Sequence, residues 1–187
     1  MKNSLERLLA DCKAGQEFTF LYFWGHTPPK DGSLNRSCLS QWWLCPFTID
    51  GITYSCAEQY MMAEKARLFH DDKNLANIMS AKTPKEMKEF GRAVSGFDRV
   101  LWERQSYEVV KKGNYAKFSQ NPDLWHYLKS TGNCILVEAS PVDRVWGIGI
   151  GQEHPNAGDP SKWEGANLLG FALTEVRDEL LEKEWTL

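Results

Sequence analysis

The sequence of 187 residues has no long apolar run, no C-x-x-C pair and no excess of basic charge. Its five cysteines and four histidines are spread without metal-ligand spacing, which argues against a zinc site and a disulfide framework. No segment approaches the roughly 20 apolar residues of a membrane span, and the N-terminus is charged where a secretory signal would be apolar. We therefore expect a reduced, cytoplasmic protein that holds no metal and meets no membrane.

The charge balance limits the kinds of ligand that this chain can bind. The formal net charge is −3, so no broad basic field exists for tight, non-specific binding of long nucleic acid. A few local cations can still bind a small anion or one modified nucleotide. Aromatic residues, in contrast, make up 12% of the chain and include eight tryptophans. Such an excess provides either a large core or flat surfaces on which bases and sugars stack.

The order of the predicted elements indicates an α+β fold, mostly helical with a small sheet. Residues 17–24 predict a strand, and residues 42–55 predict a hairpin that turns at Asp50-Gly51. Helical patterns then fill residues 55–132, and the run Thr83-Pro84-Lys85-Glu86 predicts a capping box with proline at the first helical position. A buried strand at 134–139 and a last helix from about 165 to 183 follow. This order favours α+β over a doubly wound parallel sheet. The length suits a single domain over residues 1–187, with a core from about 17 to 183.

Glu58 and Lys65 are the first candidates for chemistry. They lie seven residues apart on a predicted helix, so they share one face within roughly 20°. A carboxylate and an amine on a partly apolar stripe suit a reaction site. The alternative is structural: Ser55 and Glu58 form a capping-box pattern, and Lys65 can be a surface lysine with a buried stem.

The stretch EASPVDRVWGIGIG brings acids and a tryptophan to a glycine-rich loop directly after an apolar strand. Glu138 and Asp143 can divide acid and base roles, and Trp146 can stack on a ligand ring. Gly147 and the next two glycines allow a close approach of the backbone to a ligand. The alternative is a tight turn, in which Asp143 bonds its own backbone and Trp146 belongs to the core.

Two further segments carry weaker signals for phosphate and base binding. Asn167 lies near a predicted helix start, where free N–H groups favour a phosphate. Residues 88–118 interleave cations such as Arg92 with aromatic residues such as Trp102, a composition that suits the phosphates and base of a nucleotide. Both patterns also occur in ordinary helices, as a glycine-containing start and as a charged face beside a core stripe.

Taken together and in this order, these pieces resemble the NADAR family, to which the YbiA-type riboflavin-intermediate N-glycosidases belong. The similarity spans residues 20–180 roughly. It is carried by YFWG, FTIDGITYSCAEQYMMAEKARLF, Gly91-Arg92, Trp102, Lys117-Phe118, EASPVDRVWGIG and GANLLGFALTEVR. The resemblance implies an α+β fold with a small sheet, and cleavage of an N-glycosidic bond to ribose without a metal or another cofactor.

The resemblance also implies roles for single residues in a reaction that builds positive charge on the sugar. Glu58 would be the principal catalytic carboxylate. Lys65 would hold a phosphate or hydroxyl, or attack the sugar as a Schiff-base nucleophile. Asp143 would bind ribose hydroxyls or act as the second acid or base. The groups expected around the substrate are Trp102, Trp146, Arg92, the helix start at Asn167, Gly147, Glu138, Trp24, Gly25 and His26.

Two long segments, residues 25–41 and 152–164, are absent from the compact YbiA-type pattern. They favour a larger substrate: ADP-ribosylated guanine, as a nucleotide or in single-stranded DNA, with ADP-ribose as the product. The residues in or next to these segments that are expected to bind its extra groups are His26, Lys30, Arg36, Trp42, His154, Asn156, Lys162 and Trp163. The alternative substrate is a phosphoribosylamino-pyrimidine, an early riboflavin intermediate. Two other classes stay open, a non-catalytic ADP-ribose-binding module and an interaction protein whose tryptophans dock a partner.

Overall fold

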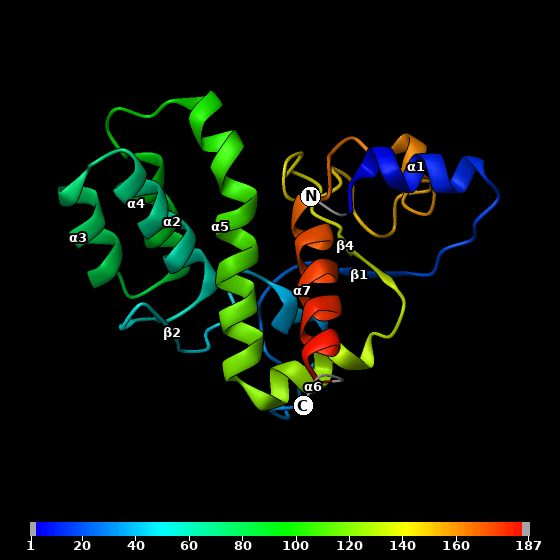
Figure 1. The fold of residues 1–187 in the computed structure, drawn as a ribbon, viewed down its shortest axis with the longest axis horizontal. Coiled ribbons are helices and arrows are strands. Elements are labelled where there is room, and N and C mark those ends of the chain that lie inside the picture. Colours follow the sequence, from blue (N-terminus) through cyan, green and yellow to red (C-terminus); the bar gives the residue numbers. More distant parts are fainter. Residues whose placement is uncertain (1–2, 185–187) are drawn as a thin grey trace. The chain divides into compact units, whose positions relative to one another are not determined.

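The computed structural model describes residues 3–184, and the chain divides into two compact units (Figure 1). We call them the strand unit, with residues up to 40 and from 123 onward, and the helical unit, with residues 41–122. Each unit carries some of the predicted site residues. The prediction of one domain over the whole chain stays a prediction.

The strand unit is built on a pair of parallel strands. Its elements are α1 (Leu5–Lys13), β1 (Phe20–Phe23), η1 (Arg36–Leu39), α6 (Pro122–Ser130), β4 (Ile135–Glu138), η2 (Pro160–Lys162) and α7 (Leu168–Glu184). β1 pairs with β4 so that Phe20 lies opposite Ile135 and Phe23 lies opposite Glu138. Because the strands are parallel, the segments that follow them leave from the same edge, where ligands bind in many α/β folds.

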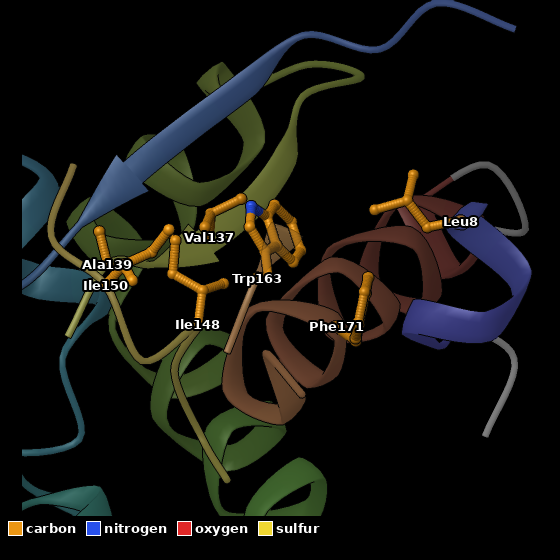
Figure 2. Packing of buried hydrophobic residues seen from close by; sticks show 7 residues of the cluster. All are labelled: Leu8, Val137, Ala139, Ile148, Ile150, Trp163 and Phe171. Carbon is orange, nitrogen blue, oxygen red and sulfur yellow. The ribbon is translucent and has the colours of Figure 1, made fainter. Parts of the chain in front are cut away.

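The core of the strand unit explains the alternation in the glycine-rich loop. Figure 2 shows Ile148 and Ile150 in a buried cluster with residues of α1, β4 and α7. The full cluster consists of Leu8, Val137, Ala139, Ile148, Ile150, Trp163 and Phe171. Every second residue of the loop therefore points into the core. Trp163, expected among the ligand-binding candidates of the second long segment, belongs to this core, where its Nε1–H donates to the Ala157 carbonyl at 2.8 Å.

α7 begins three residues later than the sequence predicted. Asn167 has φ +54°, in the left-handed region, so the helix cannot start before Leu168. The glycines on either side allow close packing. A Cβ on Gly165 would lie 2.3 Å from the Gly147 carbonyl oxygen, and one on Gly170 would lie 2.0 Å from that of Leu136. The glycines near the helix start therefore serve the contact of α7 with β4 and its loop.

The helical unit opens with the predicted hairpin. β2 (Phe47–Ile49) and β3 (Ile52–Tyr54) are antiparallel. Asp50 and Gly51 have φ of 52° and 79°, the positive values that a two-residue hairpin turn of type I′ requires. The turn prediction is thus confirmed. β2 is shorter than predicted and starts directly after Pro46, which has no N–H to give to a ladder.

Four helices complete this unit: α2 (Ala57–Leu68), α3 (Asp72–Ser80), α4 (Pro84–Arg92) and α5 (Arg99–Gln120). Nine of the twelve residues of α2 are buried, because α3, α4 and α5 all pack against it. Two glycines allow the close approach. A Cβ on Gly91 would lie 2.0 Å from the Met62 sulfur, and one on Gly113 would lie 2.6 Å from the Tyr60 ring.

The overall class agrees with the sequence prediction. Within residues 3–184, helices dominate and the strands form two separate two-stranded sheets, so the fold is α+β and mostly helical. The capping box predicted at the start of α4 is present, with Thr83 and Glu86 exchanging bonds and Pro84 at the first helical position. None of the helices described has both the length and the apolarity to cross a membrane.

Candidate functional site

Lys65 lies at the centre of a group of charged and aromatic side chains in the helical unit. Its Nζ donates to the Gly91 carbonyl at 2.8 Å and lies 4.2 Å and 6.0 Å from the ring centroids of Phe97 and Trp102. Gly91 belongs to the last turn of α4, where carbonyl groups carry partial negative charge that stabilises an ammonium. The side chain is only 9% exposed, so Lys65 is not the surface lysine of the structural alternative.

Two charged groups shift the pKa of the Lys65 amine in opposite senses. Burial lowers the pKa of Lys65, the positive charge of Arg92 lowers this pKa further, and the Glu58 carboxylate raises it in part. Arg92 and Glu58 are therefore both within electrostatic reach of the amine. A lowered pKa increases the fraction of neutral amine at a given pH, which is what a nucleophilic lysine requires.

Glu58 lies in the first turn of α2 and is 5% exposed. Its backbone N–H donates to the Gln41 carbonyl at 3.0 Å. The capping box predicted for this helix is wrong, because the N-cap is Cys56 and the Ser55 N–H and hydroxyl contact Gln59 Oε1 at 2.7 and 3.0 Å. The helix start therefore does not explain the Glu58 carboxylate, which lies buried near a buried amine.

Asp143 shapes the loop that follows β4. Its Oδ1 accepts hydrogen bonds from the N–H groups of Val145 and Trp146 at 2.9 and 2.8 Å. Its own N–H donates to Ser140 Oγ at 3.1 Å. This is the turn of the structural alternative. Oδ2 of this half-buried carboxylate makes no hydrogen bond within the described part of the chain, so one oxygen of the pair remains available to a ligand.

Gly147, Glu138 and Asn167 are joined by packing and hydrogen bonds. A Cβ on Gly147 would lie 2.8 Å from the Glu138 carbonyl oxygen, so this glycine allows the loop to contact β4. The Asn167 amide accepts from the Glu138 N–H at 3.0 Å and donates to the Leu136 carbonyl at 2.9 Å. Asn167 is thus bound to the backbone of β4 on both sides of its amide group.

The start of α7 is occupied by the same loop. The N–H groups of Leu168 and Leu169 donate to the carbonyls of Val145 and Trp146 at 3.2 and 3.1 Å. These are donors that an open helix start would offer to an anion. Here they fix the loop, and the phosphate that the sequence placed at this helix start has neither of them as a partner.

The predicted residues at the end of β1 lie beside a pocket in the strand unit. Trp24 is 60% exposed, and it is followed by Gly25, with φ +81°, and the exposed His26. The pocket has a volume of about 490 Å³. Its lining consists of Trp24, Arg36, Ala139, Pro141, Gly151, Gln152, Glu153 and His154. It thus combines an aromatic ring, a cation and polar side chains, whereas Gly25 and His26 stay outside the lining.

The two long segments that the sequence singled out meet at this pocket. Arg36, in the first segment, donates through Nη1 to Gln152 Oε1, in the second, at 2.7 Å. The same Nη1 donates to the Tyr22 carbonyl at 3.2 Å, and the Tyr22 hydroxyl donates to the Ala157 carbonyl at 3.1 Å. Arg36 and His154 were among the expected ligand-binding residues of these segments, and the structure places both on the pocket wall.

The structure brings together some of the residues that the sequence singled out, and it adds others that the sequence did not indicate. In the helical unit, the structure groups Glu58, Lys65, Arg92 and Trp102 around one amine. In the strand unit, Asp143, Trp146 and Gly147 lie on the loop after β4, Glu138 ends that strand and Asn167 precedes α7, with Trp24 at the end of the neighbouring strand. The sequence analysis did not single out Gln41, whose carbonyl accepts from the Glu58 N–H, or Asn114, which donates to Gln41. The signal for Asn114 was present as a glycine-asparagine pair, two poor helix formers, inside a long helix.

The described residues also bear on metal and thiol chemistry. Among them, no three His, Cys, Asp or Glu side chains gather closely enough to hold a metal ion. All five cysteines carry free thiols, and burial raises the pKa of Cys56 to about 11. A thiol with such a pKa is inert at neutral pH, so Cys56 belongs to the core of the helical unit.

Comparison with known proteins identifies a family model and several relatives. The model of the NADAR domain matches residues 22–181. N-glycosidase R617 of Acanthamoeba polyphaga mimivirus is 44% identical over 126 residues, which is 67% of this chain and 74% of that protein. The riboflavin biosynthesis protein PYRR of Zea mays, chloroplastic, is 33% identical over 140 residues, which is 71% of this chain and 20% of that protein.

A solved structure supports the same relationship at the level of the fold. N-glycosidase YbiA of Escherichia coli (strain K12) is 32% identical over 135 residues, which is 72% of this chain and 76% of that protein. The NMR structure of E. coli YbiA superimposes with a TM-score of 0.70 at 28% identity, covering 91% of this chain and 89% of that one. The matched region therefore includes residues of both units.

Proposed function

This chain belongs to the NADAR domain family and is an N-glycosidase, and we propose that it removes ADP-ribose from guanine bases in nucleotides or single-stranded DNA. ADP-ribose and the restored guanine are then the products. We further propose that both units form one NADAR domain, because the family match at residues 22–181 extends over them. The proposed location is the cytoplasm, as the sequence predicted.

The observation that carries the substrate proposal is the pocket where the two long segments meet. Compared with ribose phosphate, ADP-ribose adds a second phosphate, a second ribose and an adenine. Arg36 uses only Nη1 in its bonds to Gln152 and Tyr22, so Nε and Nη2 remain for a phosphate. The exposed ring of Trp24 provides a stacking face for a base. The pocket thus offers a partner for the second phosphate and one for the adenine.

The proposed chemistry in the helical unit centres on Glu58 and Lys65. Breaking the C–N bond builds positive charge on the sugar, and the Glu58 carboxylate stabilises this charge or orients the attacking water. Lys65 either binds an oxygen of the substrate as a cation or attacks C1′ as a neutral amine. Arg92 binds phosphate, and Trp102 forms an apolar wall beside the sugar.

The proposed roles in the strand unit follow from the atoms that its loop leaves available. Asp143 Oδ2 accepts from a ribose hydroxyl or serves as the second acid or base. Trp146 and Trp24, with Gly25 and His26, contact the base and the distal parts of the substrate. Asn167, Gly147 and Glu138 position this loop on β4. In this proposal Arg92 and Arg36 each bind one of the two phosphates, and Asn167 contacts neither.

A second candidate substrate is the phosphoribosylamino-pyrimidine of riboflavin synthesis. It is favoured by the printed name of the Zea mays relative, which is a riboflavin biosynthesis protein. That small substrate has no adenine and no second phosphate, so it needs neither Trp24 nor Arg36. A non-catalytic ADP-ribose-binding module would bind ADP-ribose but release no base.

The experiment that tests the proposal compares ligands and one pair of variants. Free ADP-ribose should raise the melting temperature more than ribose 5-phosphate at equal concentration, because only ligands of the native state stabilise it. Trp24→Ala should weaken ADP-ribose binding about 10- to 100-fold, the loss expected for one stacking ring. Trp125→Ala is the control, because Trp125 lies in the same unit but bonds Glu184 away from the pocket. Equal loss in both variants would contradict the proposal.

A further measurement concerns metal dependence. We propose a metal-independent reaction, since the described acids, histidines and cysteines form no metal-binding group. Turnover should then survive exhaustive dialysis against EDTA. If EDTA abolished turnover and one divalent ion restored it, the proposed roles of Glu58 and Lys65 would have to be rewritten around that ion.

A further inference from the structure

The backbone of Glu58 is held by a residue outside its helix. Glu58 is the second residue of α2, a position whose N–H has no partner within the helix. An N-cap side chain commonly satisfies such donors, but the N-cap Cys56 makes no side-chain cap bond. The Gln41 carbonyl accepts from the Glu58 N–H at 3.0 Å instead. The place of the Glu58 carboxylate therefore depends on where Gln41 is held.

Gln41 is held in turn by Asn114 of α5. The Asn114 Nδ2 donates to Gln41 Oε1 at 2.7 Å and to the Val110 carbonyl at 2.9 Å. Because both partners are acceptors, the amide orientation of Asn114 is fixed. Gln41 Nε2 also lies 3.9 Å from the Met61 sulfur on α2. The Gln41 side chain thus connects α5 with the first turns of α2.

Stability alone does not explain why position 114 is an asparagine. It is fully buried in the interior of a helix, where asparagine is a weak helix former. Its Oδ1 is buried and makes no hydrogen bond to any residue from 3 to 184. An unsatisfied buried acceptor destabilises a fold. A residue that weakens its own surroundings is typical of a functional requirement.

We propose that Gln41 and Asn114 are positioning residues that set the place of the Glu58 carboxylate for glycosidic cleavage. The proposal rests on the proposed function, because it takes Glu58 as the catalytic carboxylate. Asn114 orients Gln41, and the Gln41 carbonyl fixes the helix turn that carries Glu58. Neither residue touches the substrate.

The chain offers a matched control in Asn121. Its Nδ2 also donates to the carbonyl four residues earlier in α5, that of Lys117, at 2.8 Å. Its second bond, to the Pro46 carbonyl at 3.2 Å, also reaches the segment before β2. Asn121 lies about 10 Å further along the helix axis than Asn114. Asn121→Ala therefore also removes one bond to a carbonyl of α5 and one bond to the segment before β2, without the connection to Glu58.

The first test measures whether Asn114 and Gln41 hold the backbone of Glu58, and it needs no substrate. Amide hydrogen exchange of the full chain should become faster at Glu58 in Asn114→Ala and in Gln41→Met, but not in Asn121→Ala. Gln41→Met keeps the side-chain length, so a cavity does not explain its result. Unchanged exchange at Glu58 in both variants would overturn the proposal.

The second test measures the consequence for catalysis. Asn114→Ala and Gln41→Met should lower kcat about 10- to 100-fold, as expected for a small misplacement of a reacting group, with little change in KM. In a Glu58→Gln background, the same changes should have almost no further effect. Equal losses in Asn121→Ala, or additive losses with Glu58→Gln, would overturn the proposal. If wild type cleaved no N-glycoside, the proposed function would fail, while the exchange data would still decide the link.

Discussion

The two units hold their candidate site residues in opposite ways. In the helical unit, Glu58 and Lys65 are buried charged groups on one helix that three others enclose. In the strand unit, Asp143 bonds the backbone of its own loop, and Asn167 bonds the backbone of β4. Buried charged groups inside a packed helical unit are a stronger indicator of chemistry than a conspicuous polar residue in a loop.

The two units also differ in the kind of element that carries their candidate residues. The strand unit presents Trp24 directly after β1 and Arg36 at the first residue of the short helix η1, in the connecting regions where binding residues are commonly found. The helical unit holds its carboxylate and amine on rigid elements, which position reacting groups more accurately than loops do. We therefore propose that the principal catalytic groups belong to the helical unit and that the strand unit selects the substrate.

The largest effect is expected at Glu58. Glu58→Gln keeps the shape of the side chain and the backbone bond to Gln41, so the melting temperature should change little. The loss of a catalytic carboxylate should lower turnover by about 10² to 10⁴, some 3–5 kcal/mol of barrier. Turnover and melting temperature are measured on the same samples. A variant that turns over normally would remove chemistry from the helical unit and break the comparison.

Lys65 separates two mechanisms by its pH dependence. As a nucleophile it must be neutral, so kcat/KM should rise with pH through its pKa, which lies below the usual value. As a cation it must be charged, so kcat/KM should fall over the same range. Lys65→Arg should keep part of the activity only in the second case, since a guanidinium forms no imine. Lys65→Met should lose activity in both.

Borohydride added during turnover provides the matching chemical measurement for Lys65. In the covalent case the amine bonds to C1′ as the bond to the base breaks and the base takes up a proton. The C1′–O4′ bond of the sugar ring then opens to give the imine, with the ring oxygen taking up a proton, and borohydride reduces this imine before water can hydrolyse it. The sugar's mass is then found on Lys65. An active arginine variant without any adduct would leave only the cationic role.

A smaller effect is expected at Asp143. A conservative substitution there distinguishes the role of the side chain in the turn from the role of its negative charge. Asp143→Asn keeps an oxygen that can accept from Val145 and Trp146, so the loop and the melting temperature should be preserved. The loss of a charged hydrogen bond to the sugar should lower kcat/KM about 10- to 100-fold. Asp143→Ala, as the control, should lower both quantities. If Asp143→Asn were fully active, the residue would serve the turn alone.

The smallest effect is expected on stability, at Asp71 of the helical unit. This carboxylate accepts from the Asn74 N–H, the Ser95 N–H and the Asn74 amide, at 3.0, 2.8 and 2.7 Å, and these bonds hold its pKa well below the usual value. A depressed carboxyl pKa stabilises the fold above the unfolded value of about 3.9, and the stabilisation is lost as the pH falls towards the folded pKa. Asp71→Asn should therefore lower the melting temperature by a few degrees at pH 7. The difference should shrink in acid, and a constant difference would contradict this explanation.

Local signals in the sequence were enough for several elements of the fold. Asp50-Gly51 predicted its turn because both residues tolerate positive φ. Thr83, Pro84 and Glu86 predicted the start of α4 because the cap bonds lie within four residues. The start of α2 was predicted wrongly because the spacing of Ser55 and Glu58 fits a capping box. In the structure, Ser55 instead bonds the side chain of Gln59, one residue later. Short polar patterns fix the presence of a helix better than its first residue.

Helical periodicity alone was enough to predict that two of the candidate site residues lie close together. The spacing of Glu58 and Lys65 placed both on one face, and the structure has them in electrostatic reach. The roles of Asn167 and Gly147 depend on how α7 and the loop meet β4, and no local pattern contains that information. The bond of Asn114 to Gln41 joins residues 73 positions apart. Such partners follow from tertiary packing and were out of reach of the sequence.

The most direct measurement of the central claim is a competition between the two candidate substrates. Wild-type protein is mixed with equal amounts of ADP-ribosylated guanine in a short single strand and the phosphoribosylamino-pyrimidine, and mass spectrometry follows both products. We predict a higher kcat/KM for the ADP-ribosylated guanine, with free ADP-ribose as the product. Equal values, or cleavage of the pyrimidine alone, would contradict the account and assign this chain to the riboflavin intermediate.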